Sequence, residues 1–478
     1  MFFRRILAFV ALAGLLLGSL GACTPEANPP QTVAAGNPAA VPRPSPLPRA
    51  IERETGPVYN SPQLQALVDR IGNRLVSQSN LPGTYRFYIL DQPLPNAHAV
   101  SGGYVFVTRG LLAMVDDDAE LAAAMSHELG HLTQRHAAQR EQARKGVIDA
   151  AVQAAMTSGS IQVGRSVASN GMLELRRYSR EQELEADRVG LSYLVKAGYR
   201  GDAMAGLIDK LRRQSRLEDE LLGVEERGGQ TSSASTHPAP SDRLSALQTI
   251  PAARQPGEAD RAGYLALIDG MSVDDAPEEG FVRGSTFLHP TMRLAFEAPS
   301  DFRLLNDHDG VFGFGRDRSA MNFSCSPDKV AGRLDDWMRN KLKPTPTDIE
   351  ATTIGGMEAA IGARPRGADT GLAQVRYVLI RFGDGVCYFN LASDGPDRDR
   401  RIDVLLNAAR SFRALTAAEA AALKPYRLHI VPRGSGSAAQ YAQRLPYGDH
   451  RMARLLALNG VDNAAEFTQR SEIKLVEP

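Results

Sequence analysis

The spacing of apolar residues in the first half of the chain predicts an amphipathic helix followed by two strands. From about Ser61, apolar side chains recur every three or four positions, as they do on one face of an α-helix. These side chains belong to Leu64, Leu67, Val68, Ile71 and Leu75. Residues 85–90 and 103–108 are short runs rich in β-branched and aromatic side chains, which is typical of strands.

Two capping signals predict where the next helices begin. Asp117 stands three residues before Glu120, and Ser179 stands three residues before Gln182. In such a pair, the first side chain can accept a hydrogen bond from the backbone N–H of the second residue. We therefore expect a helix to begin at each pair, the second helix ending near Gly198.

After about residue 280 the pattern becomes that of a sheet. Apolar-rich runs at 294–298, 373–381 and 386–392 predict antiparallel strands, with a Gly-Asp-Gly hairpin turn between the last two. Helical spacing near 334–342 and 403–412 adds two helices. The elements after residue 280 therefore combine into an α+β fold.

Two C-terminal domains follow from these patterns. Residues 280–416 are expected to form an α+β domain that resembles PsbP-like sandwiches and carries no catalytic constellation. Residues 425–478 have a β–α–α–β pattern that resembles a LysM-like module, which would bind peptidoglycan. A small packing domain is the alternative for this last segment.

The N-terminal residues are typical of a targeting segment. Two arginines precede an apolar stretch at 6–20, as in a secretory signal over residues 1–23. Its end, Leu-Gly-Ala-Cys23, resembles the lipobox of bacterial lipoproteins, which implies a lipidated Cys23 and a membrane anchor. The alternatives are an ordinary cleaved signal and an uncleaved anchor helix. Residues 24–50 are expected to be a disordered, Pro-rich tether, and the protein a periplasmic one, with the outer membrane favoured over the inner.

The composition narrows the class of partner. Lys plus Arg and Asp plus Glu both number 55, so no basic surplus points to nucleic acid. Beyond Cys23 the chain has Cys325 and Cys387. An oxidising compartment permits a disulfide between them, and two buried thiols remain equally compatible with the sequence.

The strongest chemical signal is His127-Glu128-Leu129-Gly130-His131. On a helix, residues four apart lie on the same face, so both imidazoles can bind one Zn²⁺ ion. Glu128 can then reach a water molecule at that ion and act as general base. His136, five residues past His131, would be rotated about 140° away around a continuous helix and is not counted as a ligand.

A catalytic zinc site needs a third protein ligand. Glu183 can supply it from the second helix, and Asp187, four residues on, can accept the ring N–H of a ligating histidine. Glu185 is expected to be solvated. The alternative reading of this acidic run is a charged, exposed helix face.

Motifs in a fixed order resemble those of a known family. Residues 179–187 resemble the Ser-Arg-x-x-Glu-x-x-Ala-Asp signature of the gluzincin metallopeptidases. Residues 96–99 and 102–111 resemble the strand that precedes the motif helix in that family. The family includes the CAAX prenyl endopeptidase, HtpX-like enzymes and the barrel-assembly-enhancing protease BepA, and the resemblance covers about residues 60–250.

The resemblance implies roles for the matched residues. His127, His131 and Glu183 would hold one Zn²⁺ per subunit, and Glu128 would be the catalytic base. The fold implied for residues 51–265 is a mostly helical gluzincin protease domain with a small β-sheet.

Two further residues have roles implied by the same family. His237, which precedes a proline, would be a regulatory fourth metal ligand; the alternative is an ordinary loop histidine. Arg243 would stabilise the oxyanion of the transition state or form a structural ion pair.

A strand would position the substrate. If residues 103–108 lie at a sheet edge, they can align an extended or unfolded polypeptide by backbone hydrogen bonds. The positions concerned are Asn96, Gly103, Tyr104 and Val105.

The sequence thus predicts an α+β protein and a zinc metalloendopeptidase that acts on unfolded or misassembled envelope proteins. A proteolytically latched chaperone or scaffold and a peptidoglycan-binding lipoprotein are the alternatives. BepA carries helical repeats after its protease domain, whereas the tail of this chain has a β-rich pattern.

Overall fold

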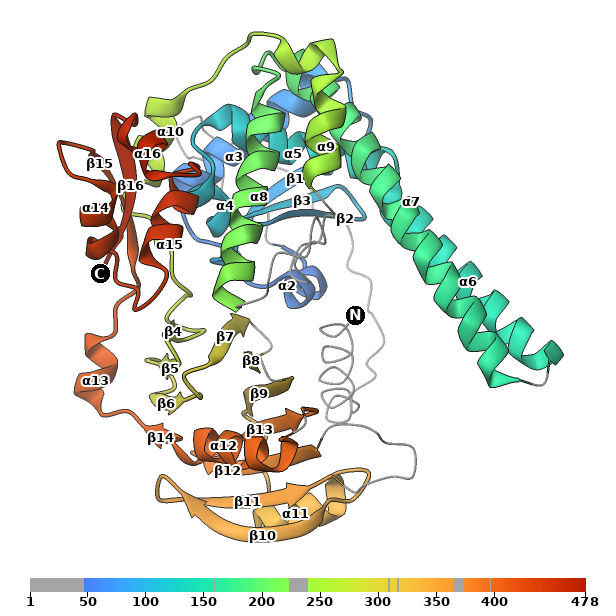
Figure 1. Ribbon diagram of the computed structural model, residues 1–478, viewed down its shortest axis with the longest axis vertical. Coiled ribbons are helices and arrows are strands. Elements are labelled where there is room, and N and C mark those ends of the chain that lie inside the picture. Colours follow the sequence, from blue (N-terminus) through green and yellow to red (C-terminus); the bar gives the residue numbers. More distant parts are fainter. Residues whose placement is uncertain are drawn as a thin grey trace, which may run out of the picture. The chain divides into compact units, whose positions relative to one another are not determined.

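The computed structural model describes residues 47–158, 160–222, 240–307, 310–315, 318–364, 374–395 and 397–478. They form two compact units (Figure 1). The helical unit comprises the described residues up to 274, together with 426–446 and 450–478, and the sheet unit comprises 275–425 and 447–449. Helices and strands both occur, so the predicted α+β class is confirmed.

A three-stranded sheet lies at the centre of the helical unit. Its order is β1 (Arg86–Leu90), β3 (Tyr104–Thr108), β2 (Ala97–Val100), with β1 parallel and β2 antiparallel to β3. The helix α3 (Pro62–Gln78) packs against this sheet through all five of its predicted apolar positions, each buried.

The next helix, α5 (Asp118–Thr133), begins where the capping signal predicts. The carboxylate of Asp117 accepts a hydrogen bond of 2.9 Å from the N–H of Glu120. Residues 119–131 of α5 are all buried. A helix buried on every side belongs to the core of a domain.

The second capping signal is wrong. Helix α7 (Ile161–Lys196) continues through Ser179 and pairs with α6 (His136–Ser158) in a long hairpin. Ser179 and Gln182 therefore lie inside a helix, where the backbone N–H groups already have partners. The end of α7 is as predicted, because Gly198 adopts a left-handed φ of 83° just beyond it.

The other elements of the helical unit are short, apart from α8. They are α2 (Arg49–Thr55), α4 (Arg109–Met114), α8 (Ala203–Leu222), α9 (Pro240–Gln248), a 3₁₀ turn (Pro251–Arg254) and α10 (Arg261–Ile268). None of the described helices has the length and apolar character needed to cross a membrane.

The C-terminal segment belongs to the helical unit. Strands β15 (Arg427–Pro432) and β16 (Glu472–Glu477) pair antiparallel, with α14 (Ala438–Arg444), α15 (Arg451–Leu458) and α16 (Ala464–Thr468) between them. Leu428 of β15 lies in the same hydrophobic core as residues of α3 and α5. The segment is therefore part of that domain's core, with three helices where the sequence predicted two.

The sheet unit contains the strands predicted after residue 280. Its seven-stranded sheet has the order β10-β11-β12-β13-β9-β8-β7, and a four-stranded sheet has the order β14-β6-β5-β4. The strand bounds are β4 (Phe281–Arg283), β5 (Thr286–His289), β6 (Leu294–Glu297), β7 (Phe302–Asp307), β8 (Gly310–Gly315), β9 (Ser319–Ser326), β10 (Thr347–Ile354), β11 (Met357–Ala363), β12 (Gln374–Phe382), β13 (Gly385–Ser393) and β14 (Arg413–Ala414). The helices are α11 (Leu334–Lys341), α12 (Arg398–Arg410) and α13 (Ala417–Ala422).

An aromatic core and a disulfide hold this unit together. Phe296, Phe323 and Phe389 come from both sheets and lie in one buried cluster with residues of α12. Cys325 and Cys387 stand opposite each other on β9 and β13 and form a disulfide. The question that the sequence left open is thereby decided in favour of the bridge.

Candidate metal centre

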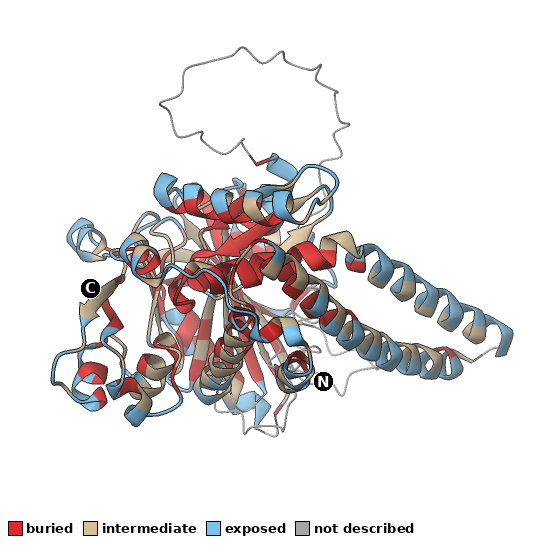
Figure 2. Cartoon of the chain, turned by 90° about the horizontal axis from the view of Figure 1, so that it is seen from above, coloured by how far each residue is buried: buried red, intermediate tan, exposed pale blue. Residues whose placement is uncertain are grey.

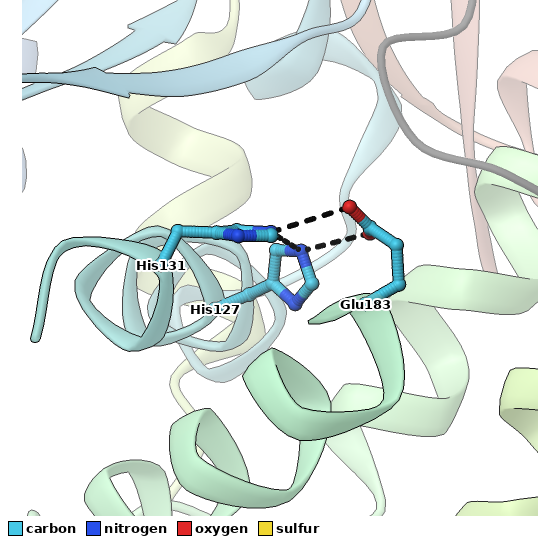
Figure 3. A group of neighbouring side chains, drawn as sticks. All are labelled: His127, His131 and Glu183. Atoms are coloured by element: carbon cyan, nitrogen blue, oxygen red, sulfur yellow. Dashed lines mark hydrogen bonds and ion pairs between the residues drawn. The ribbon is translucent and has the colours of Figure 1, made fainter. Parts of the chain in front are cut away.

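Three buried side chains from two helices converge in the helical unit (Figure 3). His127 and His131 lie one turn apart on α5, and their Nε2 atoms are 3.0 Å apart. Glu183 reaches them from α7, with its Oε2 3.4 Å from Nε2 of His127 and its Oε1 3.4 Å from Nε2 of His131. Two helices that are remote in sequence thus bring together the predicted ligands.

The separations between these donor atoms fit a zinc ion. Ligand atoms about 2.1 Å from Zn²⁺ at tetrahedral angles lie roughly 3.4 Å apart. The observed values of 3.0 and 3.4 Å are close to this. Two imidazoles and one carboxylate are also the ligand set of many catalytic zinc sites, which leave a position open.

Two glycines let α5 and α7 approach closely enough for these contacts. A Cβ atom on Gly190 of α7 would lie 2.9 Å from backbone atoms of His127. A Cβ atom on Gly130 of α5 would lie 2.9 Å from the carbonyl oxygen of Ala186. Any larger residue at either position would push the two helices apart.

Asp187 and Arg243 fix the orientation of His127. A carboxylate oxygen of Asp187 lies 2.9 Å from His127 Nδ1. Arg243, carried by α9, donates two hydrogen bonds to the same carboxylate, at 2.7 and 2.6 Å. The predicted supporting role of Asp187 has the geometry it needs. For Arg243 the ion-pair alternative is seen, and oxyanion support stays a prediction.

This arrangement shifts the pKa values of its members. Burial would raise the pKa of Asp187, but the guanidinium of Arg243 outweighs burial and holds that pKa well below its usual range. Burial would lower the pKa of His127, yet its hydrogen bonds to Asp187 and Glu183 raise it to about 9 in the metal-free protein. The carboxylate of Asp187 is therefore ionised beside His127.

His136 is a neighbour of the centre that the sequence analysis missed. The helix ends at Thr133, Arg135 adopts a left-handed φ of 59°, and α6 begins at His136. The rotation argument assumed a continuous helix, and that premise is wrong, although His136 is not one of the three residues grouped as metal ligands. His136 is wholly buried, and its Nδ1 lies 2.9 Å from Nδ1 of His131.

Glu185 completes this outer contact. One of its oxygens lies 3.4 Å from Nε2 of His136, while its side chain remains 43% exposed. The expectation of a solvated Glu185 is thus correct only in part. With Nε2 of His131 turned toward the other ligands, its Nδ1 can donate to His136, which can in turn donate to Glu185.

Glu128 lies within the same buried region. It is 3% exposed and directly follows His127 on α5. Burial lowers the pKa of His131, and the negative charge of Glu128 opposes that effect. The candidate base is therefore close to the ligand set, as the motif predicts.

The predicted substrate strand does not lie at a sheet edge. Tyr104 and Val105 belong to β3, which is the central strand, and Gly103 immediately precedes it. The edge strands are β1 and β2; four of the five residues of β1 are buried, whereas the four residues of β2 are all partly exposed. Asn96 directly precedes β2 and exchanges backbone contacts with Thr108 of β3. The sheet-edge condition set for residues 103–108 is therefore not met, because strand order depends on pairing that one segment does not reveal.

Two predicted residues cannot be placed. Cys23 and His237 lie outside the described residues. The lipidation of Cys23 and the fourth-ligand role of His237 therefore rest on sequence.

Comparison with known proteins identifies the segment that carries the centre. Residues 62–251 match peptidase family M48. The chain is 34% identical over 268 residues to a relative from Vibrio cholerae, covering 51% of this chain and 52% of that protein. It is 29% identical over 202 residues to the beta-barrel assembly-enhancing protease of Escherichia coli strain K12, covering 40% of each. The chain thus spans about half or less of the length of these relatives.

A comparison with solved structures finds only a distant similarity. The cyanobacterial PsbP (CyanoP) of Synechocystis has a TM-score of 0.22 and 16% identity, covering 27% of this chain and 91% of that chain. This score is too low to support the predicted PsbP-like sandwich.

Proposed function

We propose that this protein is a zinc-dependent endopeptidase of the cell envelope, on the premise that residues 62–251 are a domain of peptidase family M48. The observation that carries the proposal is the group of His127, His131 and Glu183, buried together within zinc-binding distance. An acidic helix face without a metal would be solvated, whereas Glu183 is 1% exposed.

In the proposed reaction, each residue around the centre has one task. A bound zinc ion would polarise the scissile carbonyl and lower the pKa of a water molecule to about 7. Glu128 takes the proton of the attacking water on a carboxylate oxygen and passes it to the leaving amine nitrogen. Asp187 accepts a hydrogen bond from Nδ1 of His127, so that Nε2 faces the other ligands.

We assign the substrate-aligning role to β2, because it is an edge strand whose four residues are all partly exposed, whereas β1, the other edge strand, is mostly buried. An extended polypeptide could pair with the outer edge of β2, and the side chains of that polypeptide would then project alternately to the two faces of the sheet. Strand pairing of this kind recognises the backbone of the substrate more than its side chains. It therefore favours unfolded or misassembled polypeptides as substrates, because their backbone is accessible.

The proposed setting is the periplasm. A lipidated Cys23 would anchor the chain to the membrane, with the outer membrane favoured, and a LysM-like segment at 425–478 would give it access to peptidoglycan. The beta-barrel assembly-enhancing protease names of the relatives support quality control of envelope proteins as the role. His237 would regulate access to the open metal position.

Metal content and proteolysis, measured together, test the proposal. Glu183→Ala should lose most of the zinc, because a catalytic site needs three protein ligands. Glu128→Gln should keep the zinc and lose at least about a hundredfold in cleavage of a denatured polypeptide, since it cannot accept the proton.

Glu181→Ala is the matched control, because Glu181 is exposed on the same helix. It should retain both zinc and activity. Unchanged zinc content in Glu183→Ala, or unchanged cleavage by Glu128→Gln, would refute the proposal.

A further inference from the structure

The outer half of the α6–α7 hairpin is mostly exposed (Figure 2), and several of its exposed residues are large and apolar. We call residues 146–158 of α6 and 162–172 of α7 the hairpin tip. On α6, Ile148, Val152 and Met156 are 47%, 52% and 75% exposed. They recur every four residues and so form a stripe along one side of the helix.

The contact between the two helices of the tip contains mostly small residues. A Cβ atom on Gly164 would lie 2.7 Å from the Cβ of Ala155 and 2.8 Å from the carbonyl oxygen of Ala151. Gly171 in turn makes room for the side chain of Val147, since a Cβ atom there would lie 2.5 Å from it. The two helices therefore approach each other closely, while Ile148, Val152 and Met156 remain outside the contact. A helical hairpin in water usually buries its large apolar side chains between the helices. Small residues at the helix contact and large apolar residues facing outward are typical of helices packed in lipid.

The charges change abruptly at the base of the tip. Within the tip, Asp149 and Arg165 are the charged residues, whereas the adjoining residues 135–145 are strongly basic. That basic segment contains one acidic residue, Glu141, and four basic ones, Arg135, Arg140, Arg144 and Lys145. Such a segment next to an apolar end matches the anionic headgroups that border the hydrocarbon of a bilayer.

The length of the tip determines how it could meet a bilayer. The 13 residues at 146–158 rise ~20 Å as an α-helix, and the hydrocarbon core of a bilayer is about 30 Å thick. The tip is therefore too short to span and long enough to enter one leaflet. This agrees with the absence of any spanning helix among the described residues.

We propose that the hairpin tip inserts its apolar side into one leaflet of an anionic membrane, with residues 135–145 at the headgroups. This goes beyond peptide hydrolysis and does not depend on it. The metal ligand Glu183 lies on α7 itself, so membrane contact by the tip would hold the metal centre at a limited distance from the lipid surface.

Vesicle sedimentation tests the proposal with a chain that begins at Thr24, which lacks Cys23 and keeps every described residue. The vesicles contain phosphatidylethanolamine and phosphatidylglycerol, or phosphatidylcholine alone. The chain should bind the anionic vesicles, and the triple substitution Ile148→Ser, Val152→Ser, Met156→Ser should lower the bound fraction at least about tenfold. Neutralising Arg140, Arg144 and Lys145 to Gln should remove the preference for anionic lipid and most of the salt dependence.

The matched control replaces polar residues of the same helix, Gln142, Gln153 and Thr157, by Ser, and it should bind like the parent chain. Zinc content and circular dichroism establish that every variant is folded. Equal binding by the apolar triple variant, or no binding by the parent chain, would overturn the proposal. A third result would also overturn it: the parent chain binds no vesicles but self-associates or binds an unfolded polypeptide, and the apolar triple variant loses that association. The partner of the apolar stripe would then be a protein and not a membrane. No peptide cleavage is measured, so a failed endopeptidase assignment would leave this result unaffected.

Discussion

At the scale of single residues, the side chains behind the metal ligands decide how the ligands point. Asp187 orients His127, and His136 occupies the equivalent place behind His131. Both contacts go to Nδ1, which leaves Nε2 of each histidine facing Glu183. A ring held in this way loses less freedom when it binds a metal, and so it binds more tightly.

Substitution of His136 tests this positioning role. His136→Phe should fill the same space without a ring nitrogen and lower zinc affinity about 10- to 100-fold. His136→Asn retains an acceptor near the former Nδ1 and should recover much of the affinity. Competition with a zinc chelator measures both. Equal affinities in the two variants and the parent would contradict the role, while a change in thermal stability alone would indicate packing only.

The guanidinium of Arg243 offers a second test at this scale. Arg243→Lys keeps the positive charge but cannot make two parallel hydrogen bonds to Asp187. We expect lower zinc affinity and a lower melting temperature, because the buried Asp187 carboxylate loses a partner. Arg188→Lys, on the same helix as Asp187 and outside this network, should leave both measurements unchanged.

At the scale of elements, the centre depends on how closely α5 and α7 approach. The three ligands come from helices whose contact includes Gly130 and Gly190, and added Cβ atoms there would meet backbone. Backbone cannot move aside as a flexible side chain can. Helix spacing therefore sets the distance from Glu183 to the two histidines.

Gly190→Ala should weaken both zinc binding and the fold, by about 1–3 kcal/mol in the free energy of unfolding. Gly146→Ala is the control, because that glycine lies in α6 with nothing within 4 Å of the added Cβ. It should stabilise the protein by up to about 1 kcal/mol, as helix propensity predicts. Denaturant titration with parallel zinc analysis measures both, and a neutral Gly190→Ala would show that the helices can separate without harm.

At the scale of the whole molecule, the last strand of the chain packs into the domain that carries the metal centre. Lys474 of β16 is fully buried and donates hydrogen bonds to the carbonyls of Ala113, Met114 and Val115, at 2.7–3.1 Å. It also pairs with Asp116 at 3.0 Å. Burial lowers the pKa of Lys474 to about 8, although the charge of Asp116 opposes this.

Lys474→Met should therefore destabilise the helical unit, by about 2–4 kcal/mol, because three buried carbonyls and a carboxylate lose a donor. Lys196→Met, an exposed position in the same unit, should have an effect within about 0.5 kcal/mol. Thermal unfolding followed by circular dichroism compares the two. Equal melting temperatures would mean that the C-terminal segment folds independently of the metal-site domain.

Acid should weaken the same junction. Burial would raise the pKa of Asp116, but Lys474, Lys210 and Arg261 outweigh it and hold that pKa well below its usual range. The stabilisation is thus complete above about pH 4, which is the pKa of an Asp carboxyl in the unfolded chain. It is lost as the pH falls from there toward the lower pKa that Asp116 has in the folded protein. Asp116→Asn should be less stable at neutral pH and show a flatter decline in melting temperature from pH 5 to pH 3. A slope equal to that of the parent would assign the acid sensitivity to other carboxylates.

The sequence by itself determined the features that depend on neighbouring residues. Spacing of four on a helix is enough to bring His127 and His131 together, the carboxylate of Asp117 caps its own helix, and the Gly383 turn forms between strands next to each other in the chain. The family motifs added Glu183 to this set. Each of these rests on local geometry, which the order of residues specifies directly.

Tertiary structure alone decided the features that depend on distant segments. The chain turns at Arg135, which brings His136 back to His131, and strand pairing places β3 at the centre of the sheet and β2 at one edge. Lys474 pairs with Asp116 although the two residues are 358 positions apart in the sequence. Neither segment contains a pattern that would predict this contact. Such contacts depend on the packing of the whole core, because the buried polar groups of distant segments must find hydrogen-bond partners in one another. The sequence of a single segment does not specify those partners.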